Sequence, residues 1–342
     1  PWRAPIRNVC KTWPSSWLKR SVPSWADDPS AVIHRVPVLD LDRLVGDEEA
    51  LVAEVGSAYR EYGFCGFRNH GVPDAVIAAA YEAIHRFFAL PSAAKLAYRS
   101  SDGGQRGYTP FGTEHARDNP VPDLKEFWHT GREMPDDNPW PDIMRPNRWP
   151  SEVSGFRPAI VALYGELDRL GRRILRLIAR SMGLDEYTFD PAIEGGNSIL
   201  RAIHYPPITD SETPAVRAAR HEDINLITLL IGSSEAGLEI LARDGSWVPV
   251  TSIPGTIVVN IGDMMKRLTN HVLPSTPHRV VNPRGAAGRQ SRYSIPFFMH
   301  PNPDYVIETL RECITPENPN RYPEPLSSHE FLIQRLRENA MM

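Results

Sequence analysis

The sequence has few cysteines and no long hydrophobic run. Its cysteines, Cys10, Cys65 and Cys313, are scattered along 342 residues, so they form neither a disulfide framework nor a CxxC zinc pattern. No segment reaches the roughly 20 consecutive apolar residues that a membrane-spanning helix needs. These absences favour a reducing, cytoplasmic location, and we expect no membrane partner.

The chain also lacks an excess of positive charge. Its formal net charge is -4, with 23% charged and 41% hydrophobic residues, which is ordinary for a globular protein. The slight negative charge disfavours nucleic acid as the main partner. The length suffices for one large core, and nothing in the sequence indicates an oligomeric state.

A pattern typical of a metal site lies in the segment HEDINLITLL, residues 221–230. Aliphatic and β-branched residues without Gly or Pro predict a single strand here. Alternate residues of a strand share a face, so His221, Asp223 and Asn225 should project together and Glu222 away from them.

His278, in the second strand-like run STPHRVV, completes a set of two histidines and one carboxylate. This is the ligand set of non-haem Fe(II) oxygenases, which leaves coordination positions open. The open positions indicate a catalytic rather than a structural metal.

A candidate carboxylate receptor follows in RYSIPFF, residues 292–298. Arg292 and Ser294 are two residues apart, so both should face one side of a strand. A guanidinium fork beside a hydroxyl suits a carboxylate. The two motifs together indicate an oxygenase with a carboxylate-bearing partner.

Nine segments occur in the order typical of one known family, and they cover most of residues 35–305. They are YGFCGFRNHGVP (62–73), HRFFALP (85–91), RGYTP (106–110), DLKEFW (123–128), LRAIHYPP (200–207), HEDINLITLL (221–230), VVNIGDMMKRLTN (258–270), STPHRVVNP (275–283) and RYSIPFFMHPNPD (292–304). With these segments the chain resembles the isopenicillin N synthase-like branch of the Fe(II)/2-oxoglutarate-dependent oxygenases.

The resemblance implies an enzyme that uses Fe(II), 2-oxoglutarate and O2. His221, Asp223 and His278 would be the iron ligands. A second set, Arg292, Ser294 and Tyr205, would hold the distal carboxylate of 2-oxoglutarate. The implied reaction hydroxylates or desaturates a small-molecule substrate while 2-oxoglutarate is converted to succinate and CO2.

Five residues are candidates for substrate contact: Tyr108, Arg201, Asn225, His271 and Phe298. Tyr108 lies in a family pocket loop, and Phe298 is where the family often has a substrate-facing aromatic residue. Arg201 shares a strand face with Tyr205. For Arg201 a structural ion pair is the favoured interpretation, and contact with an anionic substrate is the alternative. His70 and His204 are expected to have structural roles away from the metal.

The chain departs from the family pattern where plant members commonly carry Asn-Tyr-Tyr, since Ile203-His204-Tyr205 stands here. Ile224 and Asn225 likewise replace a common Tyr-Gly. The iron site is intact, but no particular plant substrate can be transferred.

Two alternatives remain open. One is a 2-oxoglutarate-independent iron oxidase, like isopenicillin N synthase or aminocyclopropanecarboxylate oxidase, in which the Arg-x-Ser pair serves the substrate. The other is a non-catalytic binding protein, metal-free or zinc-bound, on the same barrel.

Element patterns predict an α+β fold with a double-stranded β-helix (jelly-roll, cupin-like) core and flanking α-helices. The expected helices are 47–61, 74–90 with Asp74 as N-cap, 155–183 and 327–339. The expected strands include 36–41, 63–69 and 292–299, and long loops are expected at 101–122 and 132–154.

Four regions are expected along the chain. They are an N-terminal extension (1–32), a mixed α/β region (33–198), the jelly-roll core (199–305) and a C-terminal helical tail (306–342). The extension holds four of the eight tryptophans. It is interpreted as a surface extension, with a targeting segment as the alternative.

Overall fold

The computed structural model describes residues 36–100, 105–114, 121–209, 213–232, 237–250, 253–283 and 285–338. The chain from Arg35 onward forms one compact unit. The predicted N-terminal extension, residues 1–32, lies outside the described residues. Within the described ranges, no helix combines the length and hydrophobicity needed to cross a membrane.

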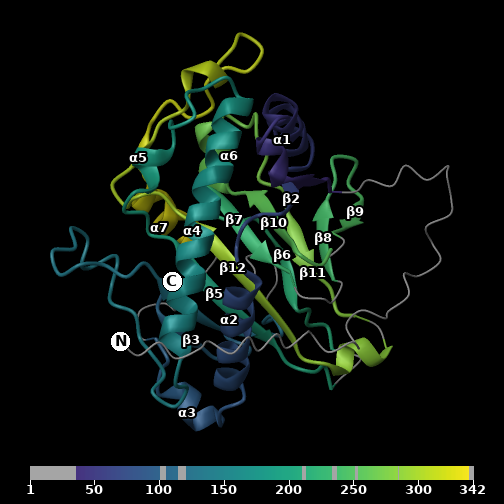
Figure 1. Cartoon of the computed structure of the whole chain (residues 1–342), viewed down its shortest axis with the longest axis vertical. Helices are drawn as coiled ribbons and strands as arrows, with labels where there is room; N and C mark the ends of the chain where they lie inside the picture. Colours follow the sequence, from purple (N-terminus) through teal and green to yellow (C-terminus); the bar gives the residue numbers. More distant parts are fainter. Residues whose placement is uncertain are drawn as a thin grey trace, which may run out of the picture. The chain divides into compact units, whose positions relative to one another are not determined.

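Helices and strands alternate in the first half, and strands dominate the second (Figure 1). The strands are β1 (Val38–Asp40), β2 (Phe64–Arg68), β3 (Gly107–Thr109), β4 (Glu126–Gly131), β5 (Ile199–Tyr205), β6 (Ala218–His221), β7 (Ile227–Ile231), β8 (Leu238–Leu241), β9 (Trp247–Pro249), β10 (Thr256–Ile261), β11 (His278–Val280), β12 (Arg292–Met299), β13 (Val306–Ile307) and β14 (Leu326–Ser327). The α-helices are α1 (Glu48–Tyr62), α2 (Asp74–Phe88), α3 (Ser92–Leu96), α4 (Phe156–Ser181), α5 (Asp190–Ile193), α6 (Asp263–Leu268) and α7 (Ser328–Glu338), and short 3-10 turns cover Leu41–Leu44, Gly285–Arg289 and Arg311–Cys313.

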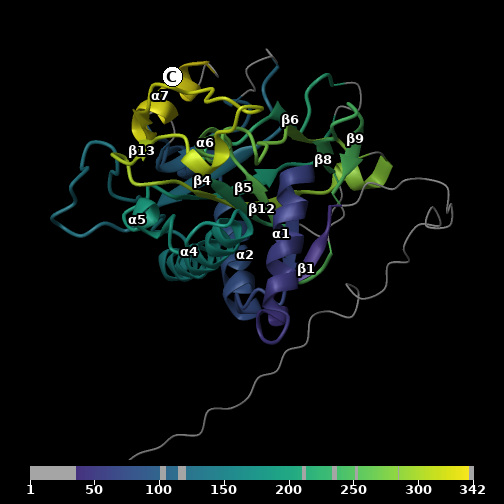
Figure 2. The ribbon, with the colours of Figure 1, turned by 90° about the horizontal axis from the view of Figure 1, so that it is seen from above.

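Two sheets form the core. The large sheet has the order β1-β2-β10-β7-β12-β5-β4-β3, and the small sheet has the order β6-β11-β8-β9. Figure 2 shows α1, α2 and α4 on one side of the large sheet and the small sheet on the other. Apolar side chains of both sheets, including Phe64, Ile240 and Val258, meet between them. The predicted α+β fold with a jelly-roll core is confirmed.

The helix α4 shows why the flanking layer forms. Its apolar residues recur every three or four positions, and Ile160, Leu167, Ile174 and Ile178 are fully buried against the sheet and its neighbours. Such a stripe stabilises a helix mainly by burying apolar area. Gly183, with φ of +74°, follows its end, as the pattern predicted.

The helices α1, α2 and α7 also confirm their predictions to within a few residues. The predicted cap of α2 is wrong. Asp74 is the first residue inside the helix, Pro73 occupies the cap position, and no side chain caps it. Proline removes a backbone donor from the first turn.

The prediction of one continuous strand over residues 221–230 is wrong. The strand β6 ends at His221, and β7 begins at Ile227 in the other sheet. The chain can leave the hydrogen-bonding pattern of the strand because groups outside the sheet bond its backbone instead. The N–H of Asp263 donates to the carbonyl of Asp223 at 2.7 Å. The buried amide of Asn225 then donates to the carbonyl of Ile227 at 3.0 Å.

The predicted loop at 101–122 also contains a strand, because β3 pairs with β4 and places Tyr108 opposite Trp128. The segment 132–154 contains neither helix nor strand, as expected. The strand β4 in turn pairs with β5, so one sheet continues across the predicted boundary between residues 198 and 199. That division remains a prediction as a domain boundary.

Candidate active site

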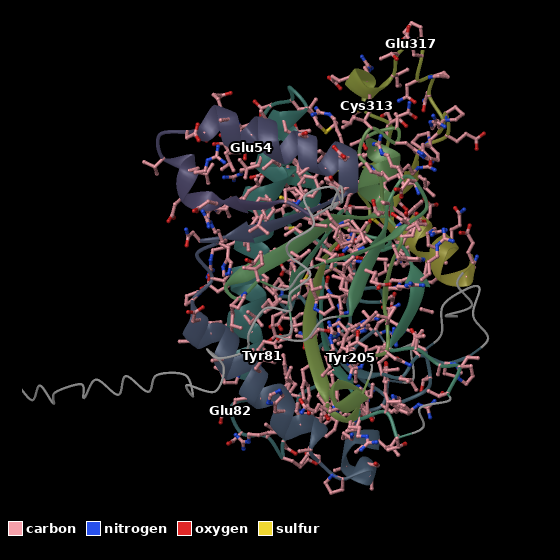
Figure 3. The ribbon with its side chains drawn as sticks, turned by 90° about the vertical axis from the view of Figure 1, so that its right-hand side faces the viewer. Glu54, Tyr81, Glu82, Tyr205, Cys313 and Glu317 are labelled. Carbon is pink, nitrogen blue, oxygen red and sulfur yellow. The ribbon has the colours of Figure 1, made fainter. Side chains whose placement is uncertain are left out.

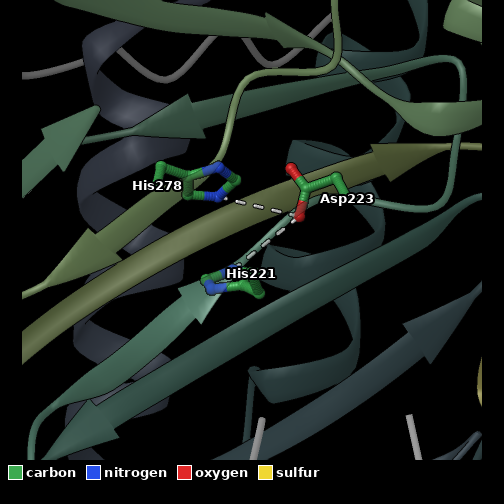
Figure 4. A group of neighbouring side chains, drawn as sticks. All are labelled: His221, Asp223 and His278. Atoms are coloured by element: carbon green, nitrogen blue, oxygen red, sulfur yellow. Dashed lines mark ion pairs between the residues drawn. The ribbon is translucent and has the colours of Figure 1, made fainter. Parts of the chain in front are cut away.

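Three potential metal ligands meet where the chain crosses from the small sheet to the large one. His221 ends β6 and His278 begins β11, and the two residues are partners across this antiparallel pair. Asp223 lies two residues further along the chain, in the connection to β7. One ligand atom from each residue lies within 4.8 Å of the others, and the side chains point toward one another (Figure 4). The predicted set is therefore brought together.

Each histidine is oriented by a carbonyl of its own strand region. The Nδ1 of His221 lies 2.8 Å from the carbonyl of Ala219, and that of His278 lies 3.1 Å from the carbonyl of Thr276. Because a carbonyl only accepts, Nδ1 carries the proton in both rings. The unprotonated Nε2 of each ring therefore faces the space beside Asp223, where its lone pair can bind a metal ion.

The two carboxylate oxygens of Asp223 have different roles: one accepts hydrogen bonds from neighbouring residues, and the other faces the histidines. Its Oδ2 accepts from the Thr228 hydroxyl at 2.6 Å and from the Asn260 amide at 2.8 Å. Its Oδ1 lies 3.8 Å from Nε2 of His278 and 4.0 Å from Nε2 of His221. Thr228 and Asn260 were missed from sequence, although a polar residue within an otherwise apolar strand was a usable signal.

The electrostatics suit a divalent cation. Burial raises the pKa of Asp223, but the two histidines and the two hydrogen bonds outweigh it, so the pKa is lowered and the carboxylate is ionised. Partial burial and the neighbouring His278 lower the pKa of His221 to about 4, so its imidazole is neutral near pH 7. Two imidazoles and one carboxylate fit Fe(II).

The candidate carboxylate receptor lies on β12. Arg292 is 4% exposed, and its Nε and Nη1 have no hydrogen-bond partner among the described residues. Ser294 lies on the same face of β12. Arg292 lies opposite Tyr205 of β5 in the antiparallel pair, and the centre of its guanidinium is 4.9 Å from the Tyr205 ring centroid. Figure 3 shows Tyr205 among the strands, far from Cys313 of the C-terminal segment. A buried guanidinium with unused donors requires an anion, so these residues fit a carboxylate ligand.

A second arginine beside Tyr205 was missed from sequence. Arg217 is fully buried, lies 5.9 Å from the Tyr205 ring centroid and donates to the carbonyl of Gln290 at 3.0 Å. It lies four residues before His221, immediately before β6 begins, and this even spacing from a predicted ligand was the available signal.

Arg201 of β5 lies among charged and aromatic residues. It forms an ion pair with Glu114 at 3.1 Å and donates to Nε2 of His129 at 2.5 Å. The ring centroids of Phe127 and Phe298 are 4.2 and 5.2 Å from the centre of its guanidinium. The predicted ion pair is present, and Phe298 lies on the same face as predicted.

Tyr108 is placed on the opposite face of the sheet, so its prediction as a substrate contact is wrong. Its hydroxyl donates to Glu126, which also binds Lys95 at 2.8 Å. The ring packs 5.8 Å from Phe87 of α2. The long-range pairing of β3 with β4, which sets this orientation, has no local sequence signal.

Asn225 and His271 are also placed away from the metal ligands. Asn225 is fully buried, and its amide donates to Thr228 at 3.0 Å, so it lies behind Asp223 because the strand on which its prediction rested is interrupted. His271 is exposed, and its Nε2 lies 2.6 Å from the Tyr322 hydroxyl in the C-terminal segment.

Three polar side chains expected to lie outside the metal site do so. Glu222 forms an ion pair with Lys266 at 3.4 Å. His204 lies 2.7 Å from Glu126 on the helix-covered face. His70 accepts a hydrogen bond from a nearby backbone N–H, which is a structural role.

A jelly roll that brings two imidazoles and one carboxylate together at the junction of its sheets defines the class of non-haem iron oxygenases. Comparison with known proteins specifies the family. Residues 196–301 match the model of the 2OG-Fe(II) oxygenase superfamily, and residues 36–152 match the model described as "non-haem dioxygenase in morphine synthesis N-terminal". The chain belongs to the 2-oxoglutarate- and Fe(II)-dependent oxygenase family.

Similar proteins extend over nearly the whole chain. A 2-oxoglutarate-Fe(II) type oxidoreductase of Aspergillus fumigatus is 33% identical, covering 88% of this chain and 92% of the relative. A solved 2OG-Fe(II) oxygenase family protein from Caulobacter crescentus is 46% identical, with a TM-score of 0.84 over 90% of this chain and 99% of that one. A Neurospora crassa protein, solved in complex with alpha-KG and thymine, is 29% identical with a TM-score of 0.79, covering 88% of this chain and 96% of that one.

The family membership confirms the predicted activity class. The protein is an enzyme, a non-haem dioxygenase that requires Fe(II), 2-oxoglutarate and O2. Dependence on 2-oxoglutarate is thus favoured over the 2-oxoglutarate-independent oxidase, and catalysis over the simple binding protein.

Proposed function

We propose that His221, Asp223 and His278 hold Fe(II), and that Arg292 and Ser294, with Tyr205, hold the distal carboxylate of 2-oxoglutarate. The observation that carries this assignment is the pair of buried Arg292 nitrogens that have no partner within the described ranges, on the same sheet that supplies Thr228 to Asp223. An orphaned buried cation is costly unless a ligand completes it.

Bound Fe(II) supplies the redox chemistry that couples decarboxylation of 2-oxoglutarate to oxidation of the substrate by O2. The chain itself positions the reactants. The carbonyls of Ala219 and Thr276 fix the rings of the two histidines. Thr228 keeps Oδ2 of Asp223 occupied, so that Oδ1 alone faces the metal position.

The proposed substrate is a small molecule, which is hydroxylated or desaturated as succinate and CO2 form. The similar Neurospora crassa protein, solved with alpha-KG and thymine, supports a small organic substrate. The aromatic residues Phe127 and Phe298 on the face of Tyr205 provide apolar area for such a molecule.

The test is formation of succinate from 2-oxoglutarate by purified enzyme with Fe(II), in air, before and after addition of candidate substrates. Asp223→Ala should abolish both succinate formation and the visible Fe(II)–2-oxoglutarate absorption seen without oxygen. If the parent enzyme binds Fe(II) but forms no succinate under any condition, the proposed function is wrong.

We also propose a cytoplasmic location. Cys65 and Cys313 are free and buried, which is typical of proteins in reducing compartments. Fractionation of the source cells would test the location, and recovery in an oxidising compartment would contradict it.

A further inference from the structure

Beyond the proposed iron and 2-oxoglutarate residues, the same sheet face carries a second group of polar side chains. Arg201 lies between the rings of Phe127 and Phe298, 4.2 and 5.2 Å from their centroids. Its charge is paired with Glu114 at 3.1 Å, and Glu114 is also paired with Lys125 at 2.7 Å. No residue of this group belongs to the proposed iron or 2-oxoglutarate sites.

This group adjoins the metal ligands. Phe298 is the cross-strand partner of Thr228, whose hydroxyl binds Asp223 at 2.6 Å. Residues opposite one another on paired strands lie about 4.5–5.5 Å apart on the same face. A molecule resting on Phe298 would therefore lie beside the metal position.

The group is electrically balanced. Lys125 contacts a second carboxylate, Asp123, at 2.9 Å. Burial raises the pKa of Glu114, but Arg201 and Lys125 outweigh it and lower that pKa. Burial lowers the pKa of Lys125, and its two carboxylate partners reverse this. Among the described residues, this group thus holds two cations and two anions, and an added substrate carboxylate would be uncompensated, which is costly in a buried site.

Two donors in this group remain unused by the described residues. Arg201 uses Nε for His129 and Nη1 for Glu114, and no described residue accepts a hydrogen bond from its Nη2. Its side chain is 18% exposed. The hydroxyl of Thr109 is buried without a partner in the described ranges, and Thr109 is paired with Phe127 across β3 and β4.

We propose that the substrate is a neutral, planar ring compound with a carbonyl group, such as a lactam or a cyclic imide. The carbonyl oxygen accepts from Nη2 of Arg201, and the ring packs against Phe298. Aromatic and guanidinium faces both favour flat partners. Arg201 and Phe298 are then specificity-determining residues. This inference rests on the proposed function, since it concerns the substrate of the same site.

The first experiment compares two panels of ring compounds of similar size. One panel holds neutral carbonyl compounds (pyrimidinediones, pyridones and quinolones), and the other holds ring carboxylates (benzoate, nicotinate and indole carboxylates). We expect some neutral members, and no carboxylates, to stimulate succinate formation. The same members should raise the melting temperature of enzyme loaded with Mn(II) and 2-oxoglutarate, a binding measurement that needs no turnover.

Variants then assign the contact. Arg201→Lys keeps the charge but loses the fork, and we expect it to raise the KM for the stimulating compound about 10- to 100-fold, as for loss of a hydrogen bond from a charged donor. Phe298→Leu should act in the same direction. Arg157→Met is the matched control, because Arg157 pairs with Glu133 on the surface, and it should change nothing.

Glu114→Gln provides a test of the charge balance. It leaves one positive charge uncompensated, so the preference for ring carboxylates over neutral compounds should rise about tenfold or more. Glu133→Gln, which removes an exposed carboxylate, should leave the preference unchanged.

The outcomes separate this inference from the proposed function. Uncoupled succinate formation without any ring compound tests the function alone. If that activity is present while carboxylates stimulate it, or while no neutral compound stimulates or stabilises, the substrate class is wrong. An unchanged KM in folded Arg201→Lys and Phe298→Leu would overturn the assigned contacts.

Discussion

At the scale of single residues, Arg292 shows how a ligand site can oppose stability. Its buried Nε and Nη1 have no partner among the described residues, so the ligand-free protein carries an uncompensated buried charge.

Arg292→Met should therefore melt at the same or a higher temperature without ligand, while the KM for 2-oxoglutarate rises about 100-fold or more because a charge-assisted pair is lost. Thermal unfolding and steady-state kinetics measure the two effects. A less stable variant with an unchanged KM would show that Arg292 is structural.

Thr228 illustrates support of a metal ligand by a neighbouring hydroxyl. Thr228→Val removes the donor to Asp223 with little change in shape, and we expect Fe(II) affinity to fall about 10- to 100-fold. Anaerobic Fe(II) titration in the presence of 2-oxoglutarate measures it. The matched control is Thr130→Val, since the Thr130 hydroxyl is buried without a partner in the described part of the chain, and Fe(II) affinity should stay unchanged there.

At the scale of elements, Glu126 joins β4 to its surroundings. It binds Lys95 of α3 at 2.8 Å, His204 of β5 at 2.7 Å and the hydroxyl of Tyr108 in β3. Burial raises its pKa, but these hydrogen bonds and Lys95 outweigh burial and lower it. The carboxylate thus stabilises the fold above its ordinary pKa, and this contribution is lost as the pH falls through the lowered value.

Glu126→Gln should lower the free energy of unfolding at pH 7 by about 3–5 kcal/mol, because Lys95 would be left buried without its partner. The difference from the parent should shrink at pH values below the ordinary glutamate pKa, as the parent itself loses the charge. Denaturant unfolding at several pH values measures this. Glu133→Gln, in an exposed pair, should cost only about 0–1 kcal/mol, and equal costs for both variants would contradict the argument.

The strands also show what could be predicted from sequence. Alternation placed Arg201, Tyr205, Arg292 and Ser294 on one face because β5 and β12 are regular and paired along their length. The same argument failed beyond His221, where the chain changes sheets. The residues that cause this change come from α6, far away in sequence.

The predicted grouping of the two histidines with Asp223 is nevertheless present in the structure, but not because alternate residues of one strand share a face. His221 meets His278 through the pairing of β6 with β11, and Asp223 returns to them after the chain has left the strand. Recognition of the family motifs predicted this set, whereas local strand geometry alone could not. For Tyr108 the family motif was present but misleading, because the pairing of β3 with β4 decides which face of the sheet its side chain occupies.

At the scale of the whole molecule, ligand binding should be visible as stability. Fe(II) and 2-oxoglutarate bind the folded chain only, so each should stabilise by about 2.7 kcal/mol at 100 times its dissociation constant. For a chain of this size we expect a rise in melting temperature of about 5 °C or more. Removal of metal with a chelator should reverse the rise, and Asp223→Ala should show no rise with Fe(II).

The cross-strand pair of histidines has a consequence for metal selection. Two imidazoles already held close together, with ring centroids 4.3 Å apart and ring planes tilted by 55°, also suit copper and zinc, which such ligands bind more tightly than Fe(II). His221 is partly exposed, with 38% of its side chain accessible, so a bound metal ion can exchange with ions in solution. Activity in the cell would then depend on which ion is most available, and we expect copper and zinc salts to inhibit the purified enzyme in competition with Fe(II).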